Sequence, residues 1–508
     1  AILAQERPDK PEGHHFLRIL NLPYIKMAMI LCLLLSALLA STTGFQLQLP
    51  KSQKNSAATA LAEHPWPTSR GPFLGQFGST NVVIPHNLSA SLAWSWHHPE
   101  GRYHTVVAGG PVIDATGNLY LTTNDGVRKL GPDGQVLWHY PQKDHMINNQ
   151  PALLDDKVFG SNMNGAAFAL DMKTGDTVWM KQLAPSAGGD AGYPAAYDGV
   201  FVVSAEKGTD PISEGGNTRV FGLDSATGTT LWEFDPAKPV WNFAPLFPGD
   251  GTCVFMDFTG GMYRVGLHNG TLLWHVSSPG AGMSFSDGGA TLGPNGAVYS
   301  CSNPGAQTGD EGTQGLVRGL RVADGALLWQ QLLPQPCNSY PAVGRLGQAE
   351  DLSVVVTPGS FMGSPNLHGS IMTFNATTGT PQWRFNAQAY TGPSFMAKGD
   401  VEGFSDRHRF DPGHEICLPA HWSAANIAGD GTVYAGRSDG FIYAVHGPTA
   451  PMPSSESSLG ELGVDFESTP GLEVQSWNAD GASLHGAFAF APGIMAFATC
   501  DTLYVFRA

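Results

Sequence analysis

Positive charge is scarce in this sequence. Lysine and arginine number 27 against 43 aspartate and glutamate residues, so the formal net charge is −16. A surface of that sign repels phosphate backbones and anionic lipid, which argues against a nucleic-acid partner. Charged residues make up only 14% of the chain, whereas glycine and proline number 63 and 37. This balance is typical of a turn-rich folded protein and indicates an all-β fold.

Familiar catalytic motifs are missing as well. No glycine-rich phosphate loop leads from a strand into a helix, and no Gly-x-Ser-x-Gly nucleophile elbow occurs. We therefore assign no catalytic residues. The one dense group of metal-capable side chains, residues 406–421, has no His-Glu-x-x-His spacing, and its prolines exclude a helix. We interpret it as a solvated loop, with a weak Zn²⁺ site as the alternative, and assign no metal ligands.

The main apolar run lies near the N-terminus. Residues 27–40 follow Lys26 and precede small residues, and they are too few to span a bilayer. We expect residues 27–44 to be a signal peptide and residues 1–26 to be an untranslated or extra segment. Residues 45–63 are interpreted as a linker, or as a transit-like segment. The predicted location is secreted or in the secretory lumen, with a plastid of secondary origin as the alternative, and no transmembrane segment is expected in the mature chain.

Three Asn-x-Ser/Thr sequons occur, at Asn87, Asn269 and Asn375. They are candidate glycosylation sites and agree with a secretory route. Three sequons in a chain of this length are near the number expected by chance, so they add little to the localisation.

Internal repetition is the most informative feature. A glycine precedes a tryptophan by four residues in six places, spaced about 40–55 residues apart, which is the spacing of β-propeller blades. Each unit also contains hairpin turns of the Asn-Gly or Asp-Gly kind, such as Asn164-Gly165, which join short antiparallel strands. The predicted structural tryptophans, including a less regular one at each end, are Trp94, Trp138, Trp179, Trp232, Trp274, Trp329, Trp383 and Trp477.

The number of blades follows from the first strand of each unit. Eight such strands begin near residues 111, 151, 194, 245, 290, 341, 424 and 487. The last unit lacks its Trp strand, whereas the strand around Trp94 has no unit of its own. If the N-terminal strand completes the last blade, no edge stays exposed. We predict an all-β, eight-bladed β-propeller of four-stranded antiparallel blades over residues 64–508, closed by an N-terminal strand.

Several of these segments resemble the repeat of the pyrroloquinoline-quinone-like (PQQ-like) propellers. Examples are Val-Phe-Gly-Ser at 158–161, Phe-Ala-Leu-Asp at 168–171 and Val-Trp at 178–179, and Trp66-Pro67 is similar to the entry of these domains. The resemblance extends to residue 506. It implies that the tryptophans pack between blades. The family includes quinone-dependent alcohol dehydrogenases and non-enzymatic members such as the bacterial outer-membrane assembly lipoprotein.

The resemblance to the dehydrogenases implies a vicinal Cys-Cys pair, a stacking tryptophan, and a calcium site beside an aspartate base. No Cys-Cys occurs in this sequence, and no local motif identifies the calcium ligands. Without Ca²⁺ and a base, hydride abstraction by a quinone lacks its electrostatic partner. We therefore expect no cofactor, and in particular no PQQ with calcium.

One face of the predicted ring carries enlarged loops, at residues 206–219, 302–318, 358–370 and 386–420, whereas the insertion at 447–471 falls on the opposite face. Function often resides on loops held by a rigid scaffold, so we expect binding on the enlarged face. Residues just before each first strand should ring the channel there, where they either bind a planar ligand or sugar or simply plug the channel. They are Asn149, Tyr193, Trp241, Asn242, Asp287, Asn338, Tyr340, Trp422 and His485.

The cysteines give one further expectation. Cys337 and Cys417 each precede a first strand, in neighbouring blades and on the same face, so we predict a disulfide between them. Cys253, Cys301 and Cys500 lie in or next to second strands, where we expect buried thiols.

The function predicted from the sequence is a monomeric extracytoplasmic scaffold for binding or assembly that engages a protein or glycan on the enlarged face. The alternatives are a quinoprotein oxidoreductase with an atypical site and a carbohydrate-active enzyme. Quinone binding would give visible absorbance and Ca²⁺ dependence, a glycan enzyme would release products, and a scaffold would do neither.

Overall fold

The computed structural model describes most of the chain from residue 63 onward. The described residues are 63–107, 109–142, 149–188, 192–209, 216–279, 284–286, 288–306, 314–347, 349–359, 368–389, 421–448, 467–481 and 483–508. Residues 61–508 form one compact unit, separate from residues 1–60. The predicted signal peptide and most of the predicted linker lie outside the described residues.

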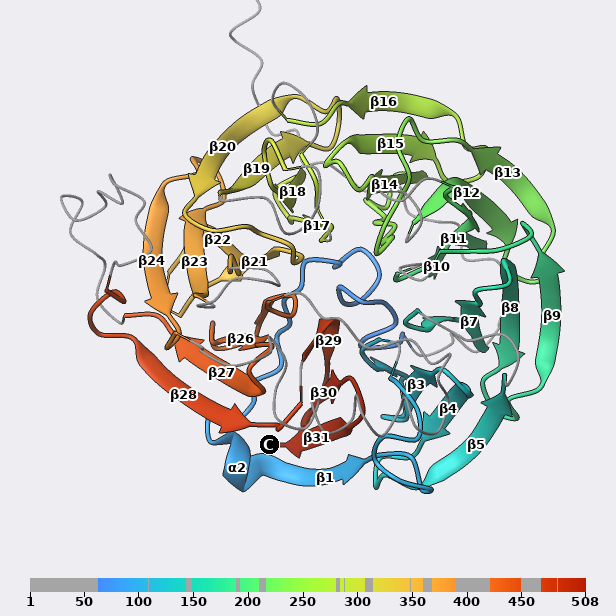
Figure 1. The fold of residues 1–508 in the computed structure, drawn as a ribbon, viewed down its shortest axis with the longest axis horizontal. Helices are drawn as coiled ribbons and strands as arrows, with labels where there is room; N and C mark the ends of the chain where they lie inside the picture. The colour runs from blue at the N-terminus through green and yellow to red at the C-terminus, as the bar shows by residue number, and fades with distance from the viewer. Residues whose placement is uncertain are drawn as a thin grey trace, which may run out of the picture. The chain divides into compact units, whose positions relative to one another are not determined.

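Eight antiparallel sheets surround a common centre, as the all-β propeller prediction requires (Figure 1). Blade 1 contains β2 (Val112–Ile113), β3 (Leu119–Thr123), β4 (Gly126–Leu130) and β5 (Val136–Pro141), and blade 2 contains β6 (Ala152–Leu154), β7 (Lys157–Ser161), β8 (Ala166–Asp171) and β9 (Thr177–Gln182). Blade 3 contains β10 (Ala195–Tyr197), β11 (Val200–Lys207), β12 (Asn217–Asp224) and β13 (Thr230–Phe234). Blade 4 contains β14 (Thr252–Met256), β15 (Met262–Gly266) and β16 (Leu272–Val276). Residue Leu246 pairs with Val254 at the inner side of blade 4.

Blade 5 contains β17 (Ala290–Leu292), β18 (Ala297–Ser302), β19 (Gly315–Arg321) and β20 (Leu327–Leu333). Blade 6 contains β21 (Ala342–Arg345), β22 (Leu352–Val356), β23 (Ser370–Asn375) and β24 (Pro381–Asn386). Blade 7 contains β25 (Asn426–Ile427), β26 (Val433–Gly436), β27 (Phe441–His446) and β28 (Glu473–Asn478). Blade 8 contains β29 (Ser483–Ala491), β30 (Ile494–Thr499), β31 (Leu503–Arg507) and β1 (Leu92–Trp96), which follows the short helix α2 (Leu88–Ser91). None of the helices in the described part of the chain is long and apolar enough to cross a membrane.

The outermost strand of blade 8 comes from the N-terminal side of the chain. β1 pairs antiparallel with β31, with Trp94 opposite Val505 and Trp96 opposite Leu503. The sheet order is therefore β1-β31-β30-β29, in which strands from the two ends of the described chain are hydrogen-bonded. In Figure 1, β1 continues the row of outermost strands between β28 and β5.

Each outer-strand tryptophan joins its blade to the next. Gly175 illustrates the reason for the Gly-x-x-x-Trp repeat, because its φ is +79° and a Cβ atom there would lie 2.9 Å from the ring of Trp138 in the preceding blade. Six indole N–H groups also donate to a carbonyl oxygen of the following blade: Trp94 to Pro132 (2.7 Å), Trp138 to Met172 (3.1 Å), Trp179 to Ser225 (3.0 Å), Trp232 to Leu267 (2.7 Å), Trp274 to Val322 (2.9 Å) and Trp329 to Ala376 (2.8 Å). The repeated glycine and tryptophan residues thus form the contacts between neighbouring blades.

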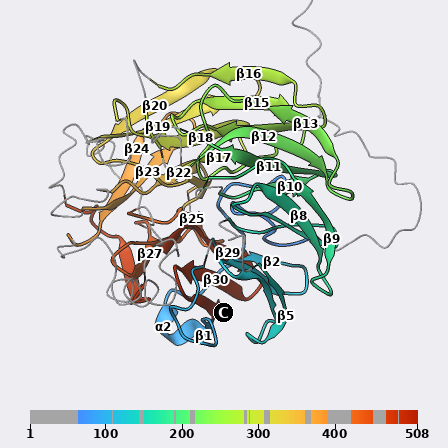
Figure 2. The ribbon, with the colours of Figure 1, turned by 45° about the vertical axis from the view of Figure 1, so that its right-hand side comes forward.

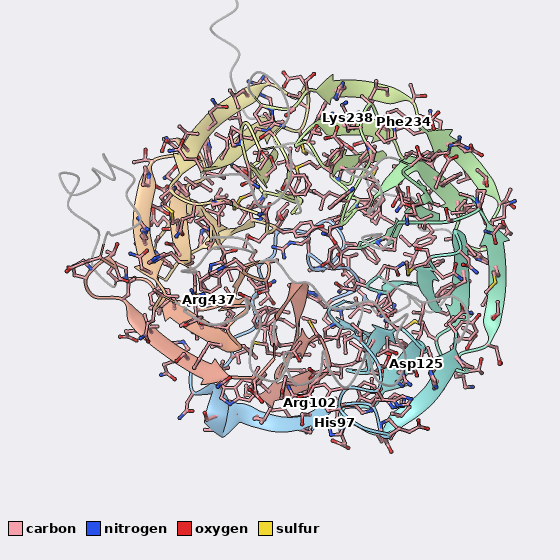
Figure 3. The ribbon with its side chains drawn as sticks, in the orientation of Figure 1. His97, Arg102, Asp125, Phe234, Lys238 and Arg437 are labelled. Carbon is pink, nitrogen blue, oxygen red and sulfur yellow. A yellow bond between two sulfur atoms is a disulfide. The ribbon has the colours of Figure 1, made fainter. Side chains whose placement is uncertain are left out.

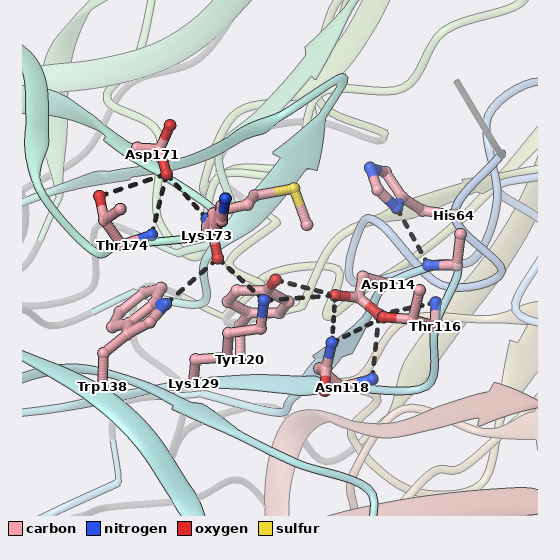
Figure 4. Close-up of polar contacts among 12 residues, drawn as sticks. His64, Asp114, Thr116, Asn118, Tyr120, Lys129, Trp138, Asp171, Lys173 and Thr174 are labelled. Carbon is pink, nitrogen blue, oxygen red and sulfur yellow. Dashed lines mark hydrogen bonds and ion pairs between the residues drawn. The ribbon is translucent and has the colours of Figure 1, made fainter. Parts of the chain in front are cut away.

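Polar contacts reinforce the junction between blades 1 and 2 (Figure 4). The Lys129 ammonium donates to the same Met172 carbonyl as Trp138, at 2.9 Å. Tyr120, one strand further in, donates its hydroxyl to Asp114 at 2.9 Å. Burial raises the pKa of Tyr120, and the adjacent Asp114 carboxylate raises it further, so the phenol stays a hydrogen-bond donor.

The centre of the ring contains residues 66–84, which we call the channel segment. In Figure 1 it lies at the centre of the ring, among the innermost strands of the blades. Contacts with all eight blades are formed by Trp66 with Ile113 and Phe490, Pro67 with Leu153, Phe73 with Tyr197, Gln76 with Phe247 and Leu292, Phe77 with Val343, and Gly78 with Ile427. The segment therefore acts as an internal tie between blades.

The structure corrects the predicted disulfide. Cys337 bonds Cys301, with Cα atoms 5.5 Å apart, and not Cys417, which lies outside the described residues. The link after β20 returns across its own blade, where Cys337 lies against Gly315 at the start of β19. Cys500 is also disulfide-bonded, so the expectation of a free thiol is wrong for Cys301 and Cys500. It is confirmed for Cys253, which is free and buried.

We expect non-reducing peptide mapping to recover Cys301 and Cys337 in one linked peptide. Replacing both with serine should lower the free energy of unfolding by about 2–4 kcal/mol, because the cross-link restricts the unfolded chain. A Cys253→Ser variant is the control for loss of a cysteine, since this thiol forms no cross-link. Recovery of Cys337 linked to any other cysteine would contradict the assignment.

Candidate binding face

The face that carries the blade-to-blade links and the connections from second to third strands is called the loop-rich face. In blade 3 the strands β11 and β12 extend to Lys207 and from Asn217, so the insertion is a lengthened hairpin. The insertions of blades 5 and 6 likewise leave from β18 and return at β19, and leave from β22 and return at β23. The central residues of these insertions, and those of the link at 386–420, lie outside the described residues.

The predicted channel-lining residues lie on links that pack against one another around the ring. Asn149 pairs with Gly192 of the next link. Gly192 in turn has a φ of +86°, and a Cβ atom there would lie 2.1 Å from the backbone nitrogen of Phe243. Such spacing admits only glycine. Asp287 and the side chain of His485 lie outside the described residues, so their predicted positions remain untested.

Side chains from the links into blades 3 and 6 meet at the centre of the ring. Tyr193 of the link into blade 3 and Tyr340 of the link into blade 6 form an edge-to-face contact, with ring centroids 5.5 Å apart. The Tyr340 hydroxyl donates to the carbonyl oxygen of Asn242. All three residues are buried. These three residues of the predicted channel lining therefore pack against one another.

Arg70 of the channel segment lies beneath this aromatic pair. It is fully buried, with its guanidinium 5.8 Å from the Tyr340 ring centroid. The guanidinium donates to the carbonyl oxygens of Pro341 (2.6 Å) and Ala425 (3.1 Å) and to the Thr291 hydroxyl (3.2 Å). Burial lowers the pKa of Arg70 to about 10, so it stays charged at neutral pH. Arg70 could not be identified from the sequence, because nothing in its local pattern places it at the axis.

Trp241 and Trp422, predicted either to stack on a ligand or to plug the channel, both contact other side chains of the protein. Trp241 stacks on Phe258 (5.8 Å between centroids) and meets the edge of Phe285 (5.4 Å). Trp422 is buried, with the Arg437 guanidinium 5.6 Å from its ring centroid. Trp422 is thus enclosed, whereas Trp241 is half-buried, with one ring face against Phe258.

Arg437 (Figure 3) also contacts His421, the last residue of the His- and Asp-rich segment 406–421. Its Nε–H donates to Nε2 of His421 at 2.9 Å, and Nη1 pairs with Asp439 at 2.9 Å. Burial raises the pKa of Asp439, and Arg437 partly opposes that shift. The Nε2 atom of His421 therefore accepts a hydrogen bond, which makes it a poor metal ligand. The remainder of the proposed Zn²⁺ loop is outside the described residues.

Asn338 and Trp422 line a narrow crevice on the loop-rich face, together with Pro336, Ser339, Thr357, Gly359 and His421. Asn338 accepts a hydrogen bond from Asn303 at 2.7 Å, and Asn149 donates to the Ser161 carbonyl at 2.8 Å. These amides are thus used in fixing links to strands. The crevice is too small for a quinone or a sugar.

A second polar group on this face was not found from the sequence. Asp125, in the turn between β3 and β4, pairs with Arg128 and lies near His98 (3.5 Å) and His139 (3.7 Å). Burial alone would raise the pKa of Asp125, but hydrogen bonds and charge from Arg128 outweigh it and hold that pKa well below its usual value. Burial lowers the pKa values of His98 and His139. The Asp-Gly sequence here had indicated only a hairpin turn.

The candidate glycosylation sites lie away from the loop-rich face. Asn269 and Asn375 are in turns between third and fourth strands, and Asn87 caps helix α2. The side chains of Asn87 and Asn269 are exposed, whereas Asn375 accepts hydrogen bonds from Thr377 and Thr378. No observation tests their modification.

The eight-bladed ring, its inter-blade tryptophans and its self-packed channel define a PQQ-like β-propeller. The chain belongs to the family described as "Outer membrane protein assembly factor BamB", whose sequence profile matches residues 123–284 and 259–447. It is similar to BamB of Moranella endobia (strain PCIT), with 22% identity over 257 residues, which is 49% of this chain and 60% of that protein. The chain thus matches less than two thirds of this relative's length.

Solved structures show the same fold. BamB from Moraxella catarrhalis has a TM-score of 0.53 and 14% identity, covering 84% of this chain and all (100%) of the other. Quinohemoprotein alcohol dehydrogenase from Comamonas testosteroni has a TM-score of 0.57 and 12% identity, covering 88% of this chain and 81% of the other. Because assembly factors and dehydrogenases share the fold, these likenesses do not decide the function.

Proposed function

We propose that this protein is a non-enzymatic scaffold that binds a protein partner on its loop-rich face in an extracytoplasmic compartment. The observation that carries the proposal is the filled channel: Arg70, Tyr193 and Tyr340 occupy the axis, where a cofactor or small substrate would otherwise enter. Binding is then a property of the surface loops on a rigid ring. Membership of the BamB family supports a protein partner, and the name of the outer-membrane relative supports the compartment.

Cross-linking tests which face binds. Lys238 (labelled in Figure 3) is exposed in the link into blade 4, on the loop-rich face, whereas Lys173 is exposed in the turn between β8 and β9, on the opposite face. We expect a lysine-reactive cross-linker, applied in the native compartment, to join a protein partner through Lys238 and to yield no such product through Lys173. Products formed mainly through Lys173, or release of the captured material by glycosidases alone, would contradict the proposal.

Quinoprotein activity is the second candidate, and the dehydrogenases of the same fold are the observation that favours it. We expect added PQQ and Ca²⁺ to give no dye-linked oxidation of simple alcohols, because Trp241 already stacks on Phe258, Trp422 is buried, and the Cys301–Cys337 disulfide is not vicinal. The absorbance spectrum of the purified protein provides an independent check. Turnover above that of a heat-denatured sample would make the quinoprotein the better assignment.

A further inference from the structure

A group of metal-capable side chains lies on the face opposite the loop-rich face. His86 follows the channel segment, Asp430 lies in the turn between β25 and β26, and His446 ends β27. Their ligand atoms all lie within 4.8 Å of one another. His86 and Asp430 are 344 residues apart in sequence, so no local motif indicates the group.

The three side chains are already oriented toward a common point. Nε2 of His86 lies 2.9 Å from Oδ2 of Asp430 and 2.9 Å from the Thr432 hydroxyl oxygen. Nδ1 of His446 lies 3.2 Å from the same hydroxyl. The other carboxylate oxygen of Asp430 accepts the backbone N–H of Thr432 at 3.0 Å, which fixes the rotation of the carboxylate.

The backbone on both sides of the group is held as well. The Tyr434 hydroxyl donates to the carbonyl oxygen of Ile84, two residues before His86, at 3.2 Å. The backbone N–H of Gly429, next to Asp430, donates to the carbonyl of Val82 at 2.7 Å. The chain leading to His86 and the turn bearing Asp430 are therefore fixed relative to each other before any ion binds.

Two imidazole nitrogens and one carboxylate oxygen are a usual protein ligand set for Zn²⁺, with water in the fourth position. The side chains of His86 and Asp430 are 32% and 26% exposed, so an ion and its water can reach them. A second group has ligand atoms within 4.8 Å of one another; it consists of His98, Glu100 and His104. There, however, Asp125 beside His98 is already paired with the Arg128 cation, which would repel a metal ion.

We propose that His86, Asp430 and His446 bind one Zn²⁺ ion, with the Thr432 hydroxyl as a neighbouring polar group. The ion would join the N-terminal side of the chain, just before α2 and β1, to blade 7. Because the unfolded chain does not bring these residues together, binding adds to the stability of the folded ring. The site is independent of the partner-binding function proposed above.

The test is zinc titration of the full chain after treatment with a chelator, with the metal content measured by mass spectrometry. We expect one high-affinity Zn²⁺ per chain, a rise in melting temperature on binding, and a Co²⁺ spectrum of a tetrahedral nitrogen and oxygen site. His86→Gln and His446→Gln should each weaken binding at least tenfold, since loss of an outer-shell partner alone typically costs about 10- to 100-fold. His268→Gln is the matched control, because His268 pairs with Asp198 (3.1 Å) and forms no three-ligand group among the described residues.

The folded state of each variant is checked by its melting temperature in chelator, and Asp430→Asn replaces any variant that does not match the wild type. Wild-type protein that binds no Zn²⁺ above the level of His268→Gln in excess chelator would overturn the proposal. So would binding that survives both histidine substitutions, or binding that is lost in His98→Gln instead.

Discussion

A chain that begins at residue 97 is expected to lose cooperative unfolding and to aggregate. The deletion removes β1, which exposes the edge of β31, and an unpaired edge strand pairs readily with other chains. It also removes the channel segment, whose contacts reach all eight blades. Urea unfolding followed by tryptophan fluorescence and circular dichroism, together with gel filtration, measures the effect.

Two further truncations separate the causes. A chain beginning at residue 61 retains the whole compact unit and should unfold like the full chain. A chain beginning at residue 87 retains α2 and β1 but lacks the channel segment, and we expect an intermediate loss of stability without the tendency to aggregate. If the chain from residue 97 unfolds in one transition as sharp as that of the chain from residue 61, the closure by β1 is wrong.

Replacing Arg70 with alanine should have the largest effect of any single substitution in the channel. The free energy of unfolding is expected to fall by about 3–5 kcal/mol, because the carbonyls of Pro341 and Ala425 and the Thr291 hydroxyl lose their donor and a cavity remains. Arg70→Met, which keeps much of the volume, separates the loss of packing from the loss of hydrogen bonds.

Arg321→Ala is the control for Arg70→Ala. Arg321 is exposed and pairs with Asp324 three residues away, so its removal should change the free energy of unfolding by less than about 1 kcal/mol. Denaturant unfolding of the variants and the wild type, under identical conditions, gives the comparison. Equal losses for Arg70→Ala and Arg321→Ala would mean that the channel does not depend on the buried cation.

The family and the repeat could be recognised from the sequence because the repeat is short-range. A glycine such as Gly175 and its tryptophan Trp179 occupy one hairpin, so their spacing is visible along the chain. The position of the filled channel could not be read in this way. Arg70 contacts Ala425, 355 residues away, and which residues of the inner links face the axis depends on the closed ring.

The disulfide shows the same limit. Cys337 was assigned to the correct face and link. Its partner could not be predicted, because that requires the position of the link relative to neighbouring strands to be known to within a few ångströms. The link returns over blade 5 and places Cys337 beside Cys301. Which of the two predicted roles Trp241 and Trp422 have likewise depends on their neighbours: Trp241 stacks on Phe258, and Trp422 is buried beside Arg437.

The sequence by itself determined the all-β class, the eight repeated units and the loop-rich face, because hairpin turns, strand alternation and the Gly-Trp spacing are set by residues within one blade. Only the tertiary structure decided that the channel is filled, which cysteines pair, and that His86, Asp430 and His446 meet. The physical reason is that these contacts join residues from separate blades, or from links and strands far apart in the chain. Their side chains come within hydrogen-bonding or bonding distance only when the ring has formed.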